Sequence, residues 1–246
     1  MPNAPQFLVD FRPFGGTCAL RGCDPKKMLI GGTSAVDHVR RMRGKGVAGD
    51  AHIDWSELMA FKRTFTDAGN CRSAPTKARA STLFNGQARF TGRQRIEVAS
   101  EPLDARFVLL ASGAEPVKLG IAGEEHLVTN EEFLSLETLP PRIAFVGGGY
   151  IAAECAHIAA QSGAKVTVLQ HGSRMLKAFD TDLVGWLMAK FQTLGVDVQT
   201  GTAAERIEKV ADGFRVWTSR DGQKQGVEAD LVVHAAGRAP ALSGLD

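Results

Sequence analysis

The sequence predicts an α/β fold, because short apolar runs typical of buried strands alternate with helical patterns along the chain. Two such runs, at residues 143–146 and 165–170, flank a glycine-rich turn and a helical stretch, which is the order of a βαβ unit. A second glycine-rich turn, near the N-terminus, leads into a helix and carries two cysteines. With 246 residues, of which 44% are apolar and 23% charged, the chain can bury one large core or two ordinary domains.

The composition argues against a nucleic-acid-binding protein, a membrane protein and a secreted disulfide-rich protein. The formal net charge of +2 is too small to indicate nucleic-acid binding. A short basic cluster near residues 40–45 is interpreted as a solvated helix end. No apolar run is long enough to span a membrane, and the N-terminus shows no signal-peptide pattern, so we expect a cytoplasmic protein. Four cysteines do not suggest a secreted disulfide scaffold, and a reactive pair fits a reducing compartment.

The stretch from Gly15 to Lys27 organises the rest of the chain. Pro25 suits the first turn of a helix, and the apolar residues that follow continue that helix. Cys18 is therefore expected on the approach and Cys23 at the helix N-terminus. The positive end of the helix dipole, with Lys26 and Lys27 nearby, favours a thiolate at Cys23. This context predicts thiol redox chemistry.

Two other interpretations of the cysteine pair are a zinc half-site and a pair of inert thiols. Zinc needs a second ligand pair, and neither Cys71 nor Cys155 stands in a paired spacing. The segment Gly-Gly-Thr-Cys-x4-Cys-x-Pro-Lys-Lys resembles the active-site motif of the flavin-dependent pyridine nucleotide-disulfide oxidoreductases, class I, in the glutathione reductase and mercuric reductase branch. The resemblance implies a Rossmann-type two-domain fold that binds FAD and NAD(P).

Residues 7–10 predict a buried strand that ends in Asp10. The resemblance implies that Asp10 binds the adenosine ribose of FAD, whereas the residue type alone suits a solvent-facing turn. In the family a strand, a Gly-x-Gly-x-x-Gly turn and a helix precede this point. Only six residues precede Phe7, so we expect the FAD-binding domain to be incomplete and to hold FAD weakly or not at all.

A helix is expected from Asp54, which serves as N-cap with Glu57, to about Asn70. Cys71 then falls in a polar, irregular stretch and is interpreted as a loop thiol without function. Residues 82–98 predict a hairpin or two strands, broken at Asn85-Gly86 and Thr91-Gly92.

Residues 107–111 predict a buried strand that runs into Ser112, Gly113 and Pro116. This end resembles the Ala-Thr-Gly-x-x-Pro segment that connects the family's flavin domain to its nucleotide domain. We therefore place a domain boundary near Val117. Thr129 and Glu132 predict a capping box at the start of a short helix.

The βαβ unit carries the second informative motif, Gly147-x-Gly149-x-x-Ala152. In a dinucleotide fingerprint the first glycine permits a tight turn, the second lets the backbone approach a pyrophosphate, and the small third residue packs the helix against the strand. Both strands and the helix from Tyr150 to Gln161 are in place, so the sequence predicts nucleotide binding. Tyr150 matches the aromatic residue that covers the family's nicotinamide pocket, and Ile151 is counted with the cofactor-binding residues.

The end of the second strand bears on the choice between NAD and NADP. An acid there would bind the 2′-hydroxyl of NAD, and cations would accommodate the 2′-phosphate of NADP. The chain has Gln170, followed by His171, Arg174 and Lys177, which favours NADP with NAD still possible.

Further along, Leu183, Leu187 and Phe191 predict an amphipathic helix, and strands are expected at 196–198, 205–210 and 214–218, with turns at Asp212-Gly213 and Asp221-Gly222. Residues 231–240 resemble the family's Gly-Arg-x-Pro return crossing, with Gly237 and Arg238 at the matching positions. We therefore expect a partial FAD-binding domain at 1–117, a nucleotide domain at 118–235 and the start of the return at 236–246.

The resemblance also implies a mechanism and its residues. By position, Cys23 would contact the flavin, Cys18 would exchange with a small-molecule disulfide, and Lys26 near flavin N5 would pair with Glu154. Further cofactor contacts are implied for Gly15, Gly16, Thr17, Ser112, Gly113, Glu154, Gly237 and Arg238. The family's homodimer interface and its acid-base histidine are not matched, so we expect this chain alone to be weakly active or inactive. A non-catalytic dinucleotide-binding module and a fragment without stable function remain as alternatives.

Overall fold

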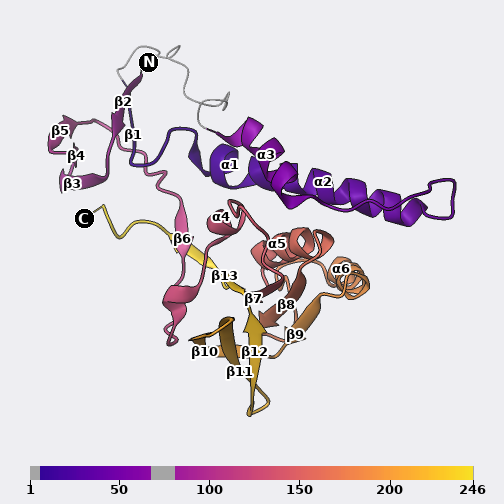
Figure 1. Ribbon diagram of the computed structural model, residues 1–246. Coiled ribbons are helices and arrows are strands. Elements are labelled where there is room, and N and C mark those ends of the chain that lie inside the picture. Colours follow the sequence, from indigo (N-terminus) through magenta and orange to yellow (C-terminus); the bar gives the residue numbers. More distant parts are fainter. Residues whose placement is uncertain (1–5, 68–80, 246) are drawn as a thin grey trace.

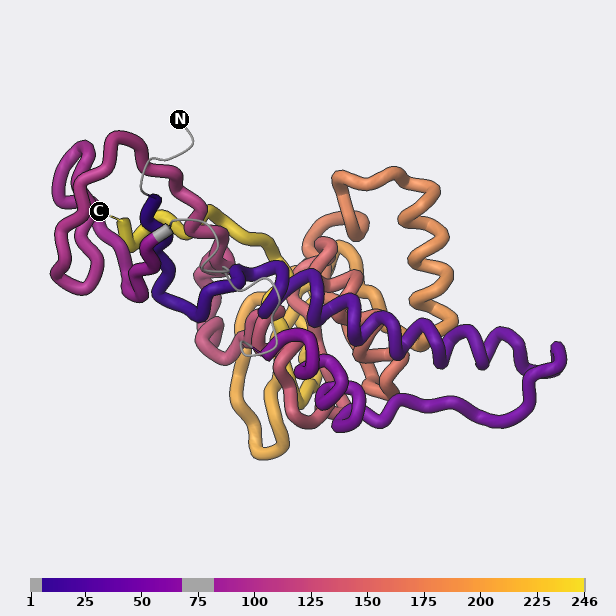
Figure 2. Tube along the Cα trace, turned by 90° about the horizontal axis from the view of Figure 1, so that it is seen from above, coloured from indigo at the N-terminus to yellow at the C-terminus, as the bar shows by residue number. Residues whose placement is uncertain are grey.

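The computed structural model describes residues 6–67 and 81–245. Figure 1 shows the chain as two parts: helices α1 to α3 with small sheets of the N-terminal part above, and a sheet flanked by helices below. Figure 2 shows that the long helix α2 runs across the lower part of Figure 1 and projects past it. The fold is α/β, as the sequence predicts.

The N-terminal part begins with a two-stranded parallel sheet, β1 (Gln6–Asp10) and β2 (Ser81–Asn85), in which Phe7 lies opposite Thr82. The strand at 7–10 is therefore present, but the prediction that it is buried is wrong, because Phe7 and Leu8 are 42% and 44% exposed. Strands of parallel sheets are normally covered on both faces. Within the described residues β1 has a single neighbouring strand, which leaves these side chains uncovered.

Three helices follow β1: α1 (Gly16–Arg21), α2 (Cys23–Met42) and α3 (Trp55–Thr66). Helix α2 begins at Cys23, as predicted, but Cys18 lies within α1 rather than on an irregular approach. Asp54 caps α3 by accepting a hydrogen bond from the Glu57 amide. Helix α3 ends at Thr66, earlier than expected; Cys71 lies outside the described residues.

A small antiparallel sheet contains β3 (Ala88–Gly92), β4 (Arg95–Val98) and β5 (Glu101–Asp104). Strand β2 ends at Asn85 and β3 at Gly92, so the two predicted breaks are confirmed. Residues 107–111 form no strand, and the prediction of a buried strand is wrong, because Phe107 and Leu109 are 81% and 91% exposed. An apolar run becomes a buried strand only where neighbouring strands and a covering layer are available, and neither is present here among the described residues.

The lower part is built on a four-stranded parallel sheet in the order β13-β7-β8-β9. Its strands and helices are β7 (Arg142–Val146), α5 (Tyr150–Gln161), β8 (Lys165–Gln170), α6 (Thr181–Thr193), β9 (Asp197–Thr200) and β13 (Leu231–His234). The predicted βαβ unit and the helix at 183–191 are confirmed. The repeated β-strand and helix order makes this part a Rossmann-type unit.

An antiparallel sheet packs beside it, formed by β10 (Ala203–Val210), β11 (Gly213–Arg220) and β12 (Gln223–Ala229). Both predicted turns join these strands, but β12 was not predicted because its residues 223–226 are polar and exposed. The remaining elements are β6 (Ala114–Pro116), η1 (Glu124–His126), α4 (Asn130–Phe133) and β14 (Arg238–Pro240). Strand β14 pairs with β6, and the capping box of Thr129 and Glu132 is present.

One hydrophobic core joins the two parts. Leu29 of α2 and Trp55 and Met59 of α3 are buried in the same cluster as Phe133 of α4 and Phe145 of β7. The ring of Phe133 packs edge-on against Phe145 at a centroid distance of 5.8 Å and tilted against Trp55 at 6.4 Å. The cysteine-bearing helices are therefore fixed to the parallel sheet by close packing.

Polar contacts reinforce this junction between α2 and helices α5 and α6. Asp37 of α2 accepts a hydrogen bond from the Gln161 amide at 3.0 Å and pairs with Lys190 of α6. These contacts, of which the Lys190 bond is the largest, lower the pKa of the Asp37 carboxyl. Arg40 also donates to Gln161, so part of the predicted solvated basic cluster takes part in the junction.

Candidate active site

The two cysteines of the motif lie on consecutive helices, Cys18 in α1 and Cys23 as the first residue of α2. The Cys18 side chain is exposed and that of Cys23 is half-buried, and both are free thiols in this structure. A hydrogen bond with the Cys23 side chain raises the pKa of Cys18, with smaller contributions from burial and from the charge on Cys23. The thiols are thus neighbours, with the more accessible sulfur belonging to Cys18.

The third described cysteine has different surroundings. Cys155 lies on α5, is 2% exposed, and burial raises its pKa to about 12. A buried thiol that stays protonated is shielded from reactants, and the thiolate is the nucleophile. Burial therefore separates Cys155 from the exposed Cys18 and the half-buried Cys23, which are the candidate reactive pair.

An ion pair connects the cysteine helix with the nucleotide-type unit. Lys26, in the first turn of α2, donates from Nζ to Glu154 Oε2 of α5 at 2.7 Å, and both side chains are partly buried. The two residues are 128 positions apart, so the fold brings them together. The predicted pairing of Lys26 with Glu154 is present, and it lies one helical turn from Cys23 and one from Tyr150.

The glycine turn between β7 and α5 has a tight, open backbone at the start of a helix. Gly147 has φ +110°, and a Cβ there would lie 2.3 Å from the Ala235 carbonyl oxygen. Gly149 is the N-cap of α5, and its Cβ direction is open except for Ala235 O at 3.6 Å. Ala152 is fully buried against the sheet and Ile151 is 8% exposed, whereas Tyr150 is 55% exposed. An open turn at a helix N-terminus fits the diphosphate of a nucleotide.

Beside this turn, Gln170 ends β8 and does not point freely into solvent. Its Oε1 accepts from the Gly148 amide at 2.8 Å, and its Nε2 donates to the Arg174 carbonyl at 3.3 Å. The guanidinium of Arg174 donates to Thr181 Oγ1 and to the carbonyls of Lys177 and Phe179. Arg174 therefore holds its own loop together, while the side chains of His171 and Lys177 are exposed.

The remaining predicted residues surround the junction of the two parts. Asp10 Oδ1 accepts from the Arg12 amide at 2.9 Å. Gly16 and Gly113 have φ of +72° and +79°, and a Cβ on either would meet nothing within 4 Å, so their backbone is open to close approach. Arg238 is anchored by Asn130 Oδ1 at 3.0 Å and by the Ala114 carbonyl. Exposed or half-buried positions are found for Gly15, Thr17, Ser112 and Gly237.

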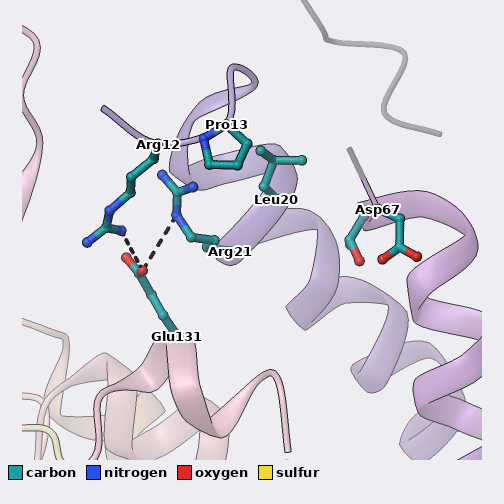
Figure 3. A pocket seen from close by; sticks show the side chains of 7 residues that line it. Arg12, Pro13, Leu20, Arg21, Asp67 and Glu131 are labelled. Atoms are coloured by element: carbon teal, nitrogen blue, oxygen red, sulfur yellow. Dashed lines mark hydrogen bonds and ion pairs between the residues drawn. The ribbon is translucent and has the colours of Figure 1, made fainter. Parts of the chain in front are cut away.

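One charged cluster was not predicted from the sequence. Arg12 and Arg21 converge on Glu131, the second residue of α4, beside a cavity (Figure 3), and Arg238 approaches the same carboxylate. Arg21 lies within the cysteine motif and Arg238 within the Gly-Arg-x-Pro segment, but neither motif indicates Glu131 as a partner, so only the fold could reveal the cluster. Across 6–67 and 81–245 no group of His, Cys, Asp and Glu could hold a metal ion, and no helix is both long and apolar enough to cross a membrane.

The cysteine pair lies at the start of α2, and the Lys26–Glu154 ion pair joins that helix to α5, which follows the glycine turn. The pyridine nucleotide-disulphide oxidoreductase family profile matches residues 4–246. The chain belongs to this family.

The relatives show how much of such a protein the chain represents. It is 34% identical over 239 residues to the glutathione reductase of Burkholderia cepacia, covering 94% of this chain and 51% of that protein. It is 30% identical over 249 residues to the dihydrolipoyl dehydrogenase of Bacillus subtilis, covering 97% of this chain and 54% of the relative. The chain spans about half the length of the curated relatives it matches.

A solved structure supports the fold. The HOCl-induced flavoprotein disulfide reductase RclA from Escherichia coli superimposes with a TM-score of 0.79 at 24% identity, over 97% of this chain and 52% of that one. At that identity the match bears on the fold alone.

Proposed function

We propose that the chain is part of an FAD-dependent NAD(P)H:disulfide oxidoreductase of the glutathione reductase type. The observation that carries this proposal is the 2.7 Å ion pair between Lys26 and Glu154. It fixes the first turn of the cysteine helix against the helix of the glycine turn, so the thiols and a bound nicotinamide nucleotide would share one site. Membership of the family supports the same chemistry.

The cysteines have distinct roles in this proposal. The Cys18 thiolate attacks one sulfur of a disulfide substrate, the substrate S–S bond breaks, and one thiol leaves. Cys23 then attacks the Cys18 sulfur, which forms the Cys18–Cys23 disulfide and releases the second thiol. The Cys18–Cys23 disulfide must then be reduced by two electrons to restore both thiols. The exposure of Cys18 suits contact with substrate, and the half-buried Cys23 suits contact with the electron donor.

FAD, when bound, would pass the two electrons of a nicotinamide hydride to the disulfide. Lys26, held by Glu154, would place a fixed positive charge beside the reacting ring. Asp10, the open backbone of Gly15, Gly16 and Thr17, and the segment of Ser112 and Gly113 would hold FAD, with Gly237 and Arg238 at the return of the chain. We assign the binding of FAD to residues 1–117 and 236–246, and the binding of the nicotinamide nucleotide to residues 118–235.

The proposed nucleotide is NADP. Gln170 is neutral, so it would not repel a 2′-phosphate, and the exposed His171 and Lys177 lie on the loop that follows it. Arg174 supports this site by holding that loop, because its donors are bound to Thr181, Lys177 and Phe179. Its predicted role as a direct phosphate ligand would require these bonds to break. A cytoplasmic location is proposed on the family resemblance; the homodimer is proposed for the full-length family, because its interface is not matched in this chain.

The visible absorption spectrum of the purified chain, incubated with FAD and then freed of unbound FAD, tests this function. Anaerobic NADPH is expected to bleach the flavin peak faster than NADH does, and a long-wavelength thiolate-to-flavin band should be lost in Cys23→Ser. Cys155→Ala is the matched control and should keep that band, since Cys155 is buried on α5. A retained flavin peak that neither nucleotide bleaches would contradict the proposal for this chain.

The second candidate function is a non-catalytic dinucleotide-binding module of residues 118–235. The uncovered β1–β2 pair and the exposed residues 107–110 favour it, because they leave the flavin half with little packed structure. This module would bind NADPH, observed as a change in nucleotide fluorescence, but would show no thiol turnover.

A further inference from the structure

The carboxylate of Glu131 is surrounded by three guanidinium groups. Arg12 Nη1 donates to Glu131 Oε2 at 2.8 Å, Arg21 Nε lies 3.5 Å from the same oxygen, and Arg238 Nη2 lies 4.0 Å from Oε1. Four separate segments contribute these groups: the loop after β1, helix α1, helix α4 and strand β14. Arg12 and Arg21 line the cavity beside Glu131 and leave an excess of one positive charge there, whereas Arg238 is not a lining residue and donates to Asn130 Oδ1 and the Ala114 carbonyl.

The side chains of Arg21, Glu131 and Arg238 are largely withdrawn from water, at 21%, 18% and 19% exposed, whereas that of Arg12 is 43% exposed. The Nε of Arg21 is buried and makes no hydrogen bond with any described residue, although it lies 3.5 Å from Glu131 Oε2. A buried donor without an acceptor is unfavourable. The Nε–H of Arg21 is thus a donor that still lacks an acceptor.

A cavity of about 480 Å³ opens beside this cluster. Arg12, Arg21 and Glu131 lie at one end of it and Asp67 at the other, with Pro13 and Leu20 between them (Figure 3). The volume is within the range of small-ligand pockets. One end can therefore receive an anion, and the carboxylate of Asp67 can accept hydrogen bonds from hydroxyl groups.

We propose that this cavity binds a phosphate or diphosphate ester and that Glu131 is a placeholder for its anionic group. A phosphate ester carries close to two negative charges and three acceptor oxygens, which suits the two planar, multi-donor guanidinium groups of Arg12 and Arg21 once Glu131 no longer accepts from them. When the phosphate binds, Arg12 and Arg21 exchange the Glu131 carboxylate for it, with no change in covalent bonds.

The placeholder role has a distinctive consequence for Glu131→Gln. If Glu131 were only a structural partner of the arginines, its neutralisation would weaken the fold and with it any site there. If it competes with the ligand, its neutralisation frees the arginines and tightens anion binding. Loss of one charge-assisted contact from the competitor corresponds to about tenfold in affinity.

Trp55 is a reporter for this site. It packs against Phe133 of α4, two residues after Glu131, and its Nε1 donates to the Leu136 carbonyl at 2.9 Å. In a Trp186→Phe, Trp217→Phe background, Trp55 is the single tryptophan of the chain. Inorganic pyrophosphate is the probe, and its titration is followed by Trp55 fluorescence at low ionic strength, where charge effects are least screened.

We expect saturable pyrophosphate binding that is about tenfold tighter in Glu131→Gln and at least about tenfold weaker in Arg21→Gln. Glu137→Gln, which neutralises a carboxylate that is 76% exposed and pairs with Arg63, should bind like the parent. Pyrophosphate bound at the glycine turn instead would respond equally in all variants. Thermal melting confirms that each variant is folded, and Glu131→Gln decides the question if Arg21→Gln does not fold.

Parallel titrations identify the source of the phosphate group. If pyrophosphate alone responds, a smaller phosphate ester fills the cavity, which supports the inference. If FAD binding shifts with the same variants, the cavity is part of the FAD site already proposed, which would overturn the inference of a separate ligand. Neither result needs flavin reduction, so the proposed redox function can fail independently. Unchanged or weaker pyrophosphate binding in folded Glu131→Gln would overturn the inference.

Discussion

Gly147→Val is expected to unfold the nucleotide part of the chain. The backbone at Gly147 has φ +110°, which valine adopts only with strain. Its Cβ would lie 2.3 Å from the Ala235 carbonyl oxygen and 2.5 Å from the Ala236 Cα. These are backbone atoms at the end of β13 and have no room to move. We expect a loss of more than about 4 kcal/mol in the free energy of unfolding, measured by urea denaturation.

Gly185→Ala provides the control for this substitution. Gly185 lies in α6, is exposed, and a Cβ there would meet nothing within 4 Å. Alanine should therefore stabilise the chain by about 0.5–1 kcal/mol through helix propensity. A folded Gly147→Val protein with parental stability would show that the turn does not have the described geometry.

Phe133→Ala is expected to have the next largest effect, because Phe133 joins the two parts of the molecule. It is fully buried and packs against Trp55 of α3 on one side and Phe145 of β7 on the other. Removing a buried phenyl ring costs about 3–5 kcal/mol in the free energy of unfolding. Trp55 fluorescence should also shift to the red as its packing partner is lost.

Phe61→Ala is the matched substitution on the surface of α3. Phe61 is 51% exposed and contacts Phe65 edge-on, so its removal should cost about 1 kcal/mol or less. Equal losses in Phe133→Ala and Phe61→Ala would contradict a shared core between the cysteine helices and the parallel sheet.

Structural features that depend on a few adjacent residues were predicted well. The start of α2 at Cys23, the capping box at Thr129 and the glycine turn at Gly147 each depend on a few adjacent residues with defined backbone needs. The ion pair of Lys26 and Glu154 was expected from the family resemblance rather than from the residues themselves, since nothing in either local segment indicates the other.

Features that depend on distant partners were predicted poorly. Residues 107–111 have the pattern of a buried strand but are exposed, because the pattern does not say whether neighbouring strands exist. The sequence predicts Arg174 as a free cation, yet the donors of its guanidinium are hydrogen-bonded within its own loop. The cluster around Glu131 forms only when four distant segments meet.

The central claim is that Cys18 and Cys23 form a redox couple, and the most direct measurement is their thiol-disulfide equilibrium. A Cys71→Ser chain would be equilibrated in glutathione buffers of graded potential, alkylated and mapped by peptide mass. We predict a Cys18–Cys23 disulfide with a midpoint of about −200 to −300 mV, while Cys155, whose pKa burial raises to about 12, stays alkylatable only after unfolding. Absence of that disulfide at every potential, or equal oxidation of Cys155, would contradict the account.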